Sequence, residues 1–167
     1  RTPDGGAMSE REAKIAERPM DGAVALITGG GSGIGAAVAD LWVRDGGRVI
    51  LLDFNPSALE AAVARLPRGA AIAAVADVAR ADDTRAAVDR SVSEWSGRLD
   101  AVVNSAGIAR PIDASTGEDA EWGRMIDIHL NGTMRVCRAS FPYLSHAGGA
   151  IVNVSSVQGI VGRAGLP

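Results

Sequence analysis

The chain contains five short, largely apolar runs, each followed by a glycine or a polar residue. None of them shows the regular alternation of apolar and polar residues that marks a half-exposed strand, so each is typical of a strand buried on both faces. Strands of this kind belong to a parallel sheet that helices cover on both sides. The runs occupy residues 24–28, 49–52, 70–76, 99–103 and 150–154.

Four helical patterns separate these runs, and two of them carry clear end signals. A pair of glycines follows the first pattern, and Asn55-Pro56 supplies a favoured cap and first helical position for the second. This alternation predicts right-handed βαβ units, and hence an α/β fold built on a doubly wound parallel sheet. The chain has 167 residues, enough for one such domain with its own core. The helical patterns cover residues 33–45, 56–66, 84–95 and 118–145.

A glycine-rich turn with the sequence TGGGSGIG, residues 28–35, joins the first apolar run to the first helix. Glycines allow a tight turn and let the backbone approach a ligand closely. The helix that follows directs unpaired N–H groups and the positive end of its dipole at the turn, which suits a pyrophosphate. Because the turn lies between a strand and a helix, the pattern indicates a dinucleotide site rather than a plain turn.

Asp53 ends the second apolar run, 24 residues after Gly29. A carboxylate at about this spacing accepts hydrogen bonds from an adenosine ribose. On its own the residue is equally consistent with a helix cap or a loop aspartate, and the glycine turn favours the ribose. The neighbours Phe54 and Gly30 offer no cation to a 2′-phosphate, so we expect NAD rather than NADP as the cofactor.

Charge and composition argue against several other classes of function. The net charge is −3 and the pI is about 5.4, which argues against a nucleic-acid-binding surface. No apolar run approaches the roughly 18 residues of a membrane span, and residues 1–20 are typical of a disordered tail rather than a secretory signal. The single cysteine, Cys137, suits a reducing cytoplasm, and no Cys/His cluster offers a metal site.

The chain resembles the classical short-chain dehydrogenases/reductases in several motifs that occur in the family's order. Residues 28–35 match the family's TGxxxGIG turn, and Asp77-Val78 matches the pair that reads the adenine ring. The sequence NSAG at residues 104–107 is similar to the NNAG motif, with serine in place of the second asparagine. A later strand resembles the one that delivers the catalytic serine, which aligns with Ser156. The resemblance covers about residues 22–167 and implies a Rossmann-type fold.

The resemblance also implies roles for individual residues within a NAD-binding domain over residues 21–167, whose C-terminal part is missing from this chain. Ser156 is expected to hydrogen-bond the reacting oxygen of the substrate. The family's counterpart of Asn104 steadies the central strand of the sheet. The cofactor-binding residues expected from the motifs and the resemblance are Gly29, Ser32, Gly33, Ile34, Gly35, Asp53, Phe54, Asp77, Val78, Asn104, Ala106 and Gly107.

His129 marks a first departure from the family pattern. The family has an asparagine in its fourth helix, in a pattern like DVNLxGT, where this chain reads DIHLNGT over residues 127–133. Asn131 does not substitute, because it lies roughly 200° around a helix from His129. His129 shares its helical face with Ile126 and Thr133, so it is expected to point inward. Two interpretations stay open: a packed, hydrogen-bonded histidine, or a catalytic member of the proton relay whose imidazole bonds the water that an amide would bond.

The second departure concerns the general base. The family uses a tyrosine with a lysine four residues later, about a dozen residues beyond the serine, and this position falls just past Pro167. Tyr143 is no substitute because no lysine stands four residues after it, and the only lysine is Lys14. We therefore expect the Tyr/Lys pair beyond Pro167, and we expect a chain that stops at Pro167 to be poorly soluble and inactive.

Together these features predict an NAD-dependent oxidoreductase that interconverts a secondary alcohol and a ketone in the cytoplasm, without a nucleic-acid or membrane partner. The family commonly forms dimers or tetramers, so a homo-oligomer is expected of the complete protein. Two alternatives remain: a non-catalytic dinucleotide-binding module produced by truncation, and a methyltransferase, which also pairs a glycine turn with an acidic residue after its second strand. The TGxxxGIG spacing and the motif at residues 104–107 argue against the methyltransferase.

Overall fold

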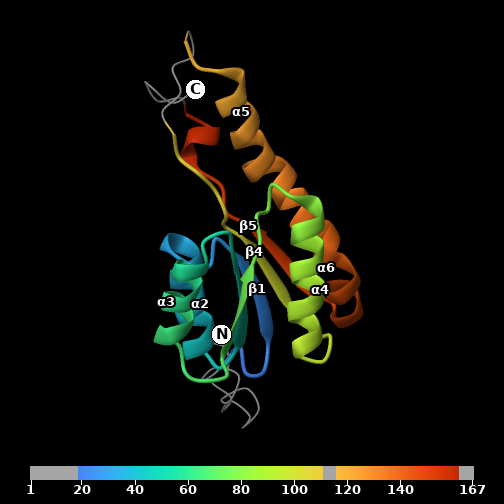
Figure 1. Cartoon of the computed structure of the whole chain (residues 1–167). Coiled ribbons are helices and arrows are strands. Elements are labelled where there is room, and N and C mark those ends of the chain that lie inside the picture. The colour runs from blue at the N-terminus through green and yellow to red at the C-terminus, as the bar shows by residue number, and fades with distance from the viewer. Residues whose placement is uncertain (1–18, 111–115, 162–167) are drawn as a thin grey trace, which may run out of the picture.

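The computed structural model describes residues 19–110 and 116–161, and within them five strands form one sheet (Figure 1). The strands are β1 (Val24–Thr28), β2 (Arg48–Asp53), β3 (Ala71–Val75), β4 (Ala101–Asn104) and β5 (Ala150–Asn153). Their order is β3-β2-β1-β4-β5, and every neighbouring pair is parallel. The chain thus builds outward from β1 in one direction and then returns to add β4 and β5 on the other side. This order confirms the predicted α/β fold with a doubly wound, Rossmann-type sheet.

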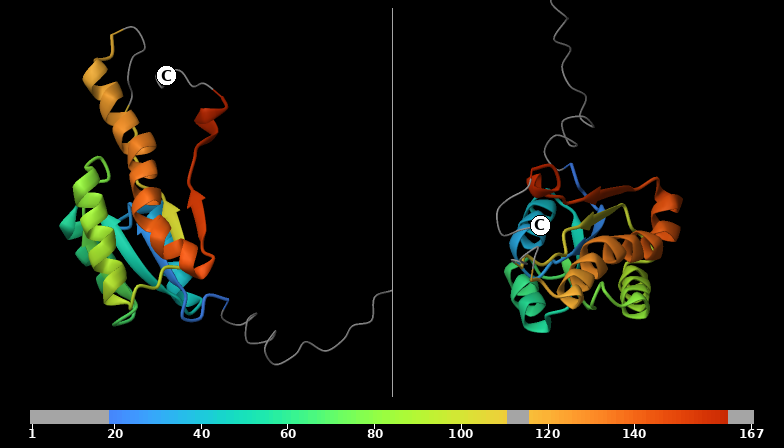
Figure 2. Two further views of the ribbon diagram at one scale, coloured as in Figure 1. Left: turned by 90° about the vertical axis from the view of Figure 1, so that its right-hand side faces the viewer. Right: turned by 90° about the horizontal axis from the view of Figure 1, so that it is seen from above.

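Helices cover both faces of the sheet. They are α2 (Gly33–Arg44), α3 (Pro56–Arg65), α4 (Ala81–Glu94), α5 (Asp119–Ile126), the π-helical segment η1 (Asp127–Gly132) and α6 (Thr133–Ala147), and a short 3-10 turn, η2 (Val157–Gly159), follows β5. In Figure 1, α2 and α3 lie on one face and α4 and α6 on the other. α5, η1 and α6 run on as one long element, and its α5 end extends beyond the carboxyl ends of the strands (Figure 2).

Two apolar clusters, one on each face of the sheet, form the core. Alternate residues of a strand contribute to opposite clusters because successive side chains of a strand point to opposite faces. In β1, Leu26 belongs to the cluster that contains Val88 of α4, and Ile27 belongs to the cluster that contains Leu59 of α3. All five residues of β1 are buried, which explains why its sequence is an unbroken apolar run.

The two outermost strands are more exposed than their apolar sequences predict. All four residues of β5 are exposed, and only one of the five residues of β3 is buried. Each of these strands pairs with a single neighbour, because each forms an edge of the described sheet. The prediction that the runs at residues 70–76 and 150–154 are buried on both faces is therefore wrong for the structure described.

The single helix predicted over residues 118–145 is interrupted by the π-helical turns of η1. The backbone at both junctions stays right-handed helical, with φ −59° and ψ −41° at Ile126 and φ −54° and ψ −48° at Thr133, so the helix keeps its direction. Such turns occur frequently at functional sites. The sequence analysis missed this segment because a 3.6-residue apolar period does not reveal a local change in hydrogen-bond register.

In the part of the chain that the structure covers, no helix is long and apolar enough to cross a membrane. The same residues contain no group of three His, Cys, Asp or Glu side chains that could hold a metal ion. The disordered tail predicted for residues 1–20 lies, apart from its last two residues, outside the described ranges.

Candidate cofactor site

A cavity of about 400 Å³ opens at the carboxyl ends of β1 to β4, where the strand order reverses. Ligands of doubly wound sheets bind at this place, because loops that leave the sheet in opposite directions form a crevice between them. Residues that follow all four strands line the cavity, and α5 and η1 add a helical wall. Eleven of the twelve predicted cofactor-binding residues line it: Gly29, Ser32, Gly33, Ile34, Gly35, Asp53, Phe54, Asp77, Val78, Ala106 and Gly107.

The glycine-rich turn after β1 brings its own backbone and the start of α2 to the cavity. Gly29 has a positive φ of 66°, and a β-carbon there would lie 3.1 Å from backbone atoms of Ala106. A β-carbon on Gly35 would clash with the carbonyl oxygen of Gly29 and lie 2.8 Å from Oγ of Ser105. The close approach of α2 to the exit of β1 therefore requires glycine. The first turn of α2 contains no acidic residue, so its leading N–H groups can hold a phosphate.

The carboxylate of Asp53 is held at the end of β2 by backbone N–H groups on both sides. Gly31 N–H donates to Oδ2 at 3.1 Å, and Asn55 N–H donates to Oδ1 at 3.0 Å. Each carboxylate oxygen can accept two hydrogen bonds, so both keep capacity for ribose hydroxyls. Among the cavity-lining residues of the described ranges, Arg124 is the only cation, and it comes from α5 rather than from the turns beside Asp53.

The loop after β3 forms a compact turn at residues 77–80. The N–H of Ala79 donates to Oδ1 of Asp77 at 2.9 Å, and the N–H of Arg80 donates to the Asp77 carbonyl at 2.9 Å. The buried hydroxyl of Thr84, from α4, lies 3.3 Å from the same carbonyl and 2.9 Å from that of Arg80. Asp77 and Val78 both line the cavity, and these bonds fix their position relative to it.

Thr28 and Ser105 tie the exits of β1 and β4 together. Oγ1 of Thr28 accepts the N–H groups of Ser105 at 3.1 Å and Ala106 at 3.0 Å, and the Ser105 hydroxyl donates to the Thr28 carbonyl. Ser105 also lines the cavity, although the sequence analysis did not include it among the site residues. Ser105 stands between Asn104 and Ala106, both predicted site residues, and this position in the sequence could have identified it as a site residue.

Asn104 is the one predicted cofactor-binding residue that does not line the cavity. Its buried side chain turns toward β5 and α6, where Nδ2 donates to Oδ1 of Asn153 at 2.9 Å and lies 3.3 Å from Sγ of Cys137. This geometry links the two strands, as the family's strand-steadying asparagine would.

His129 is exposed rather than buried, and its ring contacts the loop after β4. Its Nε2 lies 2.8 Å from the carbonyl oxygen and 3.1 Å from the N–H nitrogen of Ile108, so the tautomer decides whether it donates or accepts. A β-carbon on Gly107 would lie 2.6 Å from Cε1 of the ring. His129 lies in the π-helical segment rather than in regular α-helix. The ring is hydrogen-bonded and positioned at the loop that forms one wall of the cavity.

Ser156 lies outside the cavity wall. It is exposed and caps η2, where its hydroxyl accepts the N–H of Gln158 at 3.2 Å. Tyr143 is also remote from the cavity wall, and its hydroxyl donates to Asp89 at 2.9 Å. The structure therefore brings the predicted cofactor residues together, while the predicted catalytic serine remains apart from them.

Seven further residues line the cavity besides Ser105, and the sequence analysis did not select them. Most are small or apolar side chains that fill the wall, and a sequence pattern gives no sign that such residues face a cavity. Arg124 and Ile128 enter only because the long helix crosses the carboxyl edge of the sheet. The seven residues are Leu52, Asn55, Ala58, Ala76, Ile108, Arg124 and Ile128.

Comparisons with known proteins agree on one family. The model of the family described as short chain dehydrogenase matches residues 23–167. D-threitol dehydrogenase from Mycolicibacterium smegmatis is 42% identical over 140 residues, which make up 82% of this chain and 54% of that protein. Galactitol 2-dehydrogenase (L-tagatose-forming) from Cereibacter sphaeroides is 39% identical over 145 residues, or 85% of this chain and 56% of that protein. The chain thus spans little more than half the length of these relatives.

A solved structure shows the same arrangement. The crystal structure of 3-ketoacyl-(acyl-carrier-protein) reductase from Brucella melitensis complexed with NADH superposes with a TM-score of 0.83 at 31% identity. The match covers 88% of this chain and 62% of that one. Both the sequence and the structural relatives therefore carry this arrangement as part of a longer protein.

Proposed function

Because the chain belongs to the short chain dehydrogenase family, we propose that it supplies the cofactor-binding part of an NAD-dependent oxidoreductase that interconverts a secondary alcohol and a ketone. The observation that carries the proposal is the single cavity that the glycine turn, the Asp53 carboxylate and the loop at residues 77–80 all line. The relatives named as dehydrogenases and the neighbour complexed with NADH support the reaction class.

The residues around the cavity fit a dinucleotide in chemistry and in shape. The leading N–H groups of α2 hold the pyrophosphate, Asp53 accepts the ribose hydroxyls, and Asp77 and Val78 lie against the adenine ring. Gly31 and Gly35 let the turn pack closely against its neighbours, because a β-carbon at either would meet protein atoms closer than 3 Å. When bound, the nicotinamide ring of the cofactor accepts or delivers the hydride.

Asp53 also selects between the two nicotinamide cofactors in this proposal. A carboxylate at the ribose hydroxyls repels a 2′-phosphate, and the exposed Phe54 beside it offers no compensating charge. Arg124, from the helical wall, is the only cation among the cavity-lining residues described. The cavity is therefore expected to prefer NAD(H).

The proposed catalytic step needs a group that holds the reacting oxygen and groups that move a proton. Ser156 holds the oxygen, and His129, placed at the loop beside the cavity, is the further candidate for the proton relay. The tyrosine and lysine that the family resemblance implies do not occur four residues apart anywhere in residues 1–167. The substrate is a small alcohol or ketone and the complete protein is a homo-oligomer, as the family resemblance implies. The single cysteine suits a cytoplasmic location.

Titration of the full-length protein with NADH and with S-adenosylmethionine tests the reaction class. Transfer of fluorescence from tryptophan to bound NADH reports binding, and S-adenosylmethionine should neither bind nor displace NADH. Gly35→Val serves as a loss-of-site variant, because its β-carbon would clash with the Gly29 carbonyl and displace the glycine turn from α2. Binding of S-adenosylmethionine in place of NADH would contradict the proposal. Binding of NADH with no turnover of any secondary alcohol would leave a dinucleotide-binding module.

A further inference from the structure

The long helix passes directly behind the cavity wall at Val78. Gly132, the last residue of η1, has no room for a side chain, because a β-carbon there would lie 2.9 Å from Cγ2 of Val78. Val78 is buried and lines the cavity. The position of the loop at residues 77–80 is therefore coupled to the helix at the junction of η1 and α6.

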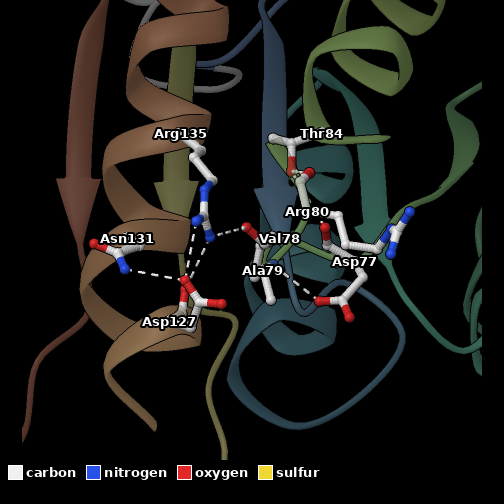
Figure 3. Close-up of polar contacts among 8 residues, drawn as sticks. All are labelled: Asp77, Val78, Ala79, Arg80, Thr84, Asp127, Asn131 and Arg135. Carbon is white, nitrogen blue, oxygen red and sulfur yellow. Dashed lines mark hydrogen bonds and ion pairs between the residues drawn. The ribbon is translucent and has the colours of Figure 1, made fainter. Parts of the chain in front are cut away.

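Arg135 reaches back from α6 to the same loop (Figure 3). Its Nη1 donates to the carbonyl of Val78 at 3.4 Å and to that of Asp127 at 3.3 Å, and its Nη2 donates to Oδ1 of Asp127 at 2.9 Å. The Arg135 side chain is 21% exposed, so most of it is removed from water. A charged group in that situation keeps its partners, because leaving them unpaired is costly.

Asp127 is fixed in turn by Asn131, whose Nδ2 donates to the same Oδ1 at 3.0 Å. Hydrogen bonds from Asn131 and Arg135 hold the pKa of the Asp127 carboxyl below its usual range. The carboxylate therefore stays ionised opposite a guanidinium that is always protonated. These three side chains belong to one long helix. Among the described residues, their one hydrogen bond to another part of the chain is the bond from Arg135 to the Val78 carbonyl.

The other hydrogen bonds of the loop run within it or to α4. The Asp77 carbonyl accepts Arg80 N–H and the Thr84 hydroxyl, and Oδ1 of Asp77 accepts Ala79 N–H (Figure 3). Arg135 thus holds the loop from the side opposite to α4. Without Arg135 the loop keeps only the hydrogen bonds within itself and to α4. Asp77 and Val78, which line the cavity, would then be held less firmly in the position where the ligand contacts them.

We infer that Arg135 is a positioning residue for the adenine end of the bound dinucleotide, and that Asp127 and Asn131 hold its guanidinium in place. The inference rests on the proposed function, in which Asp77 and Val78 lie against the adenine ring. Arg135 is not among the residues that line the cavity, so it acts through the backbone of Val78.

Calorimetric titration with ADP-ribose tests this inference in the full-length protein. ADP-ribose carries the adenine, both riboses and the pyrophosphate, and its binding does not depend on turnover. Arg135→Met keeps the length of the side chain and removes its donors, and it should weaken ADP-ribose about fivefold, as loss of one net hydrogen bond would. Arg135→Lys, which keeps a charged donor, should recover part of this loss. Arg138→Met is the matched control, because Arg138 is exposed on the same helix and makes no hydrogen bond or ion pair with other described residues.

The titration separates positioning from general loss of structure. An irreversibly misfolded fraction lowers the number of binding sites per chain, whereas a reversibly unfolded fraction raises the apparent dissociation constant. Urea unfolding of each variant therefore accompanies the titration, and the dissociation constants are compared at a temperature where every variant is fully folded. The inference predicts a raised dissociation constant with the number of sites unchanged. An unchanged dissociation constant for Arg135→Met, with the wild-type protein binding normally, would overturn the role of Arg135. Failure of the wild-type protein to bind ADP-ribose would instead contradict the proposed function.

Discussion

At the scale of single residues, backbone atoms hold the side chains of the candidate site. The carboxylate of Asp53 accepts N–H groups from Gly31 and Asn55, and the ring of His129 lies against the backbone of Gly107 and Ile108. Contacts of this kind depend on the local path of the chain. A single carbon atom added beside them is therefore expected to act on the site directly.

Gly107→Ala is predicted to displace the ring of His129, because the new β-carbon would lie 2.6 Å from Cε1. The ring is expected to give up its hydrogen bond to Ile108, at a cost of about 1 kcal/mol in the free energy of unfolding. Adding His129→Ala in the same chain removes the clash, so the double variant should be no less stable than His129→Ala alone. Urea unfolding of the three variants measures this. If Gly107→Ala lowers the free energy of unfolding equally in the presence and in the absence of the His129 side chain, the ring does not contact residue 107.

Substitution of His129 itself distinguishes a catalytic from a packing role. If it serves the proton relay, His129→Ala should lower kcat of the full-length enzyme about 100-fold with the fold intact. His129→Asn should be tolerated, because an amide can both donate to and accept from the Ile108 backbone. Steady-state kinetics corrected for folded protein provide the measurement. If both variants lose thermal stability and keep their turnover per folded molecule, His129 only packs.

At the scale of elements, β1 is fixed at both ends to the strand that returns beside it. At its amino end, Val24 N–H donates to Oδ2 of Asp100 at 2.7 Å, just before β4. At its carboxyl end, Oγ1 of Thr28 accepts two N–H groups from the loop after β4. The cavity opens at the carboxyl end of this pairing, beside the contacts of Thr28.

Thr28→Val is predicted to destabilise the protein by about 2 kcal/mol, because it leaves the N–H groups of Ser105 and Ala106 without their acceptor. Valine has nearly the shape of threonine, so packing is little changed. Thr133→Val is the control: its hydroxyl only donates to the carbonyl of His129 at 2.8 Å, within the helix. Chemical unfolding should separate the two variants clearly. A loss for Thr28→Val no larger than that for Thr133→Val would contradict the role given to Thr28.

Asp100→Asn is predicted to cost stability at neutral pH and much less in acid. Burial would raise the pKa of Asp100, but hydrogen bonds from Arg98 and Val24 outweigh it and hold that pKa below its ordinary value. A lowered folded-state pKa stabilises the protein above the unfolded-state pKa of about 3.9, and this contribution disappears as the pH falls through the folded value. The difference in unfolding free energy from wild type should be about 1 kcal/mol at neutral pH and should shrink below about pH 4. A difference independent of pH would contradict this account.

At the scale of the whole molecule, the sequence predicts what depends on local pattern. The strand β1 and the turn that follows it are placed correctly because burial on both faces leaves an unbroken apolar run and the tight turn requires glycine. Asp53 ends β2 and Asp77 lies two residues beyond β3, and parallel strands end at one edge of a sheet. Eleven of the twelve predicted cofactor residues therefore share one cavity.

The features that the sequence analysis missed depend on how elements meet in space. The exposure of β5 follows from its place at a sheet edge, and the contact of His129 with the loop after β4 joins residues about twenty positions apart in the sequence. Arg124 reaches the cavity because the long helix crosses the edge of the sheet, and Arg135 reaches Val78 from eleven residues further along the helix. A one-dimensional pattern of apolar residues contains none of this information.

Asp53 is proposed to bind the adenosine ribose of the cofactor in this cavity, and the ratio of affinities for NADH and NADPH measures that role. Fluorescence titration of the full-length protein should show NADH binding at least tenfold more tightly than NADPH, a difference of about 1.4 kcal/mol. Asp53→Ala, which removes the charge that repels the 2′-phosphate, should narrow that ratio. Equal affinities of the wild-type protein for the two cofactors would contradict the account.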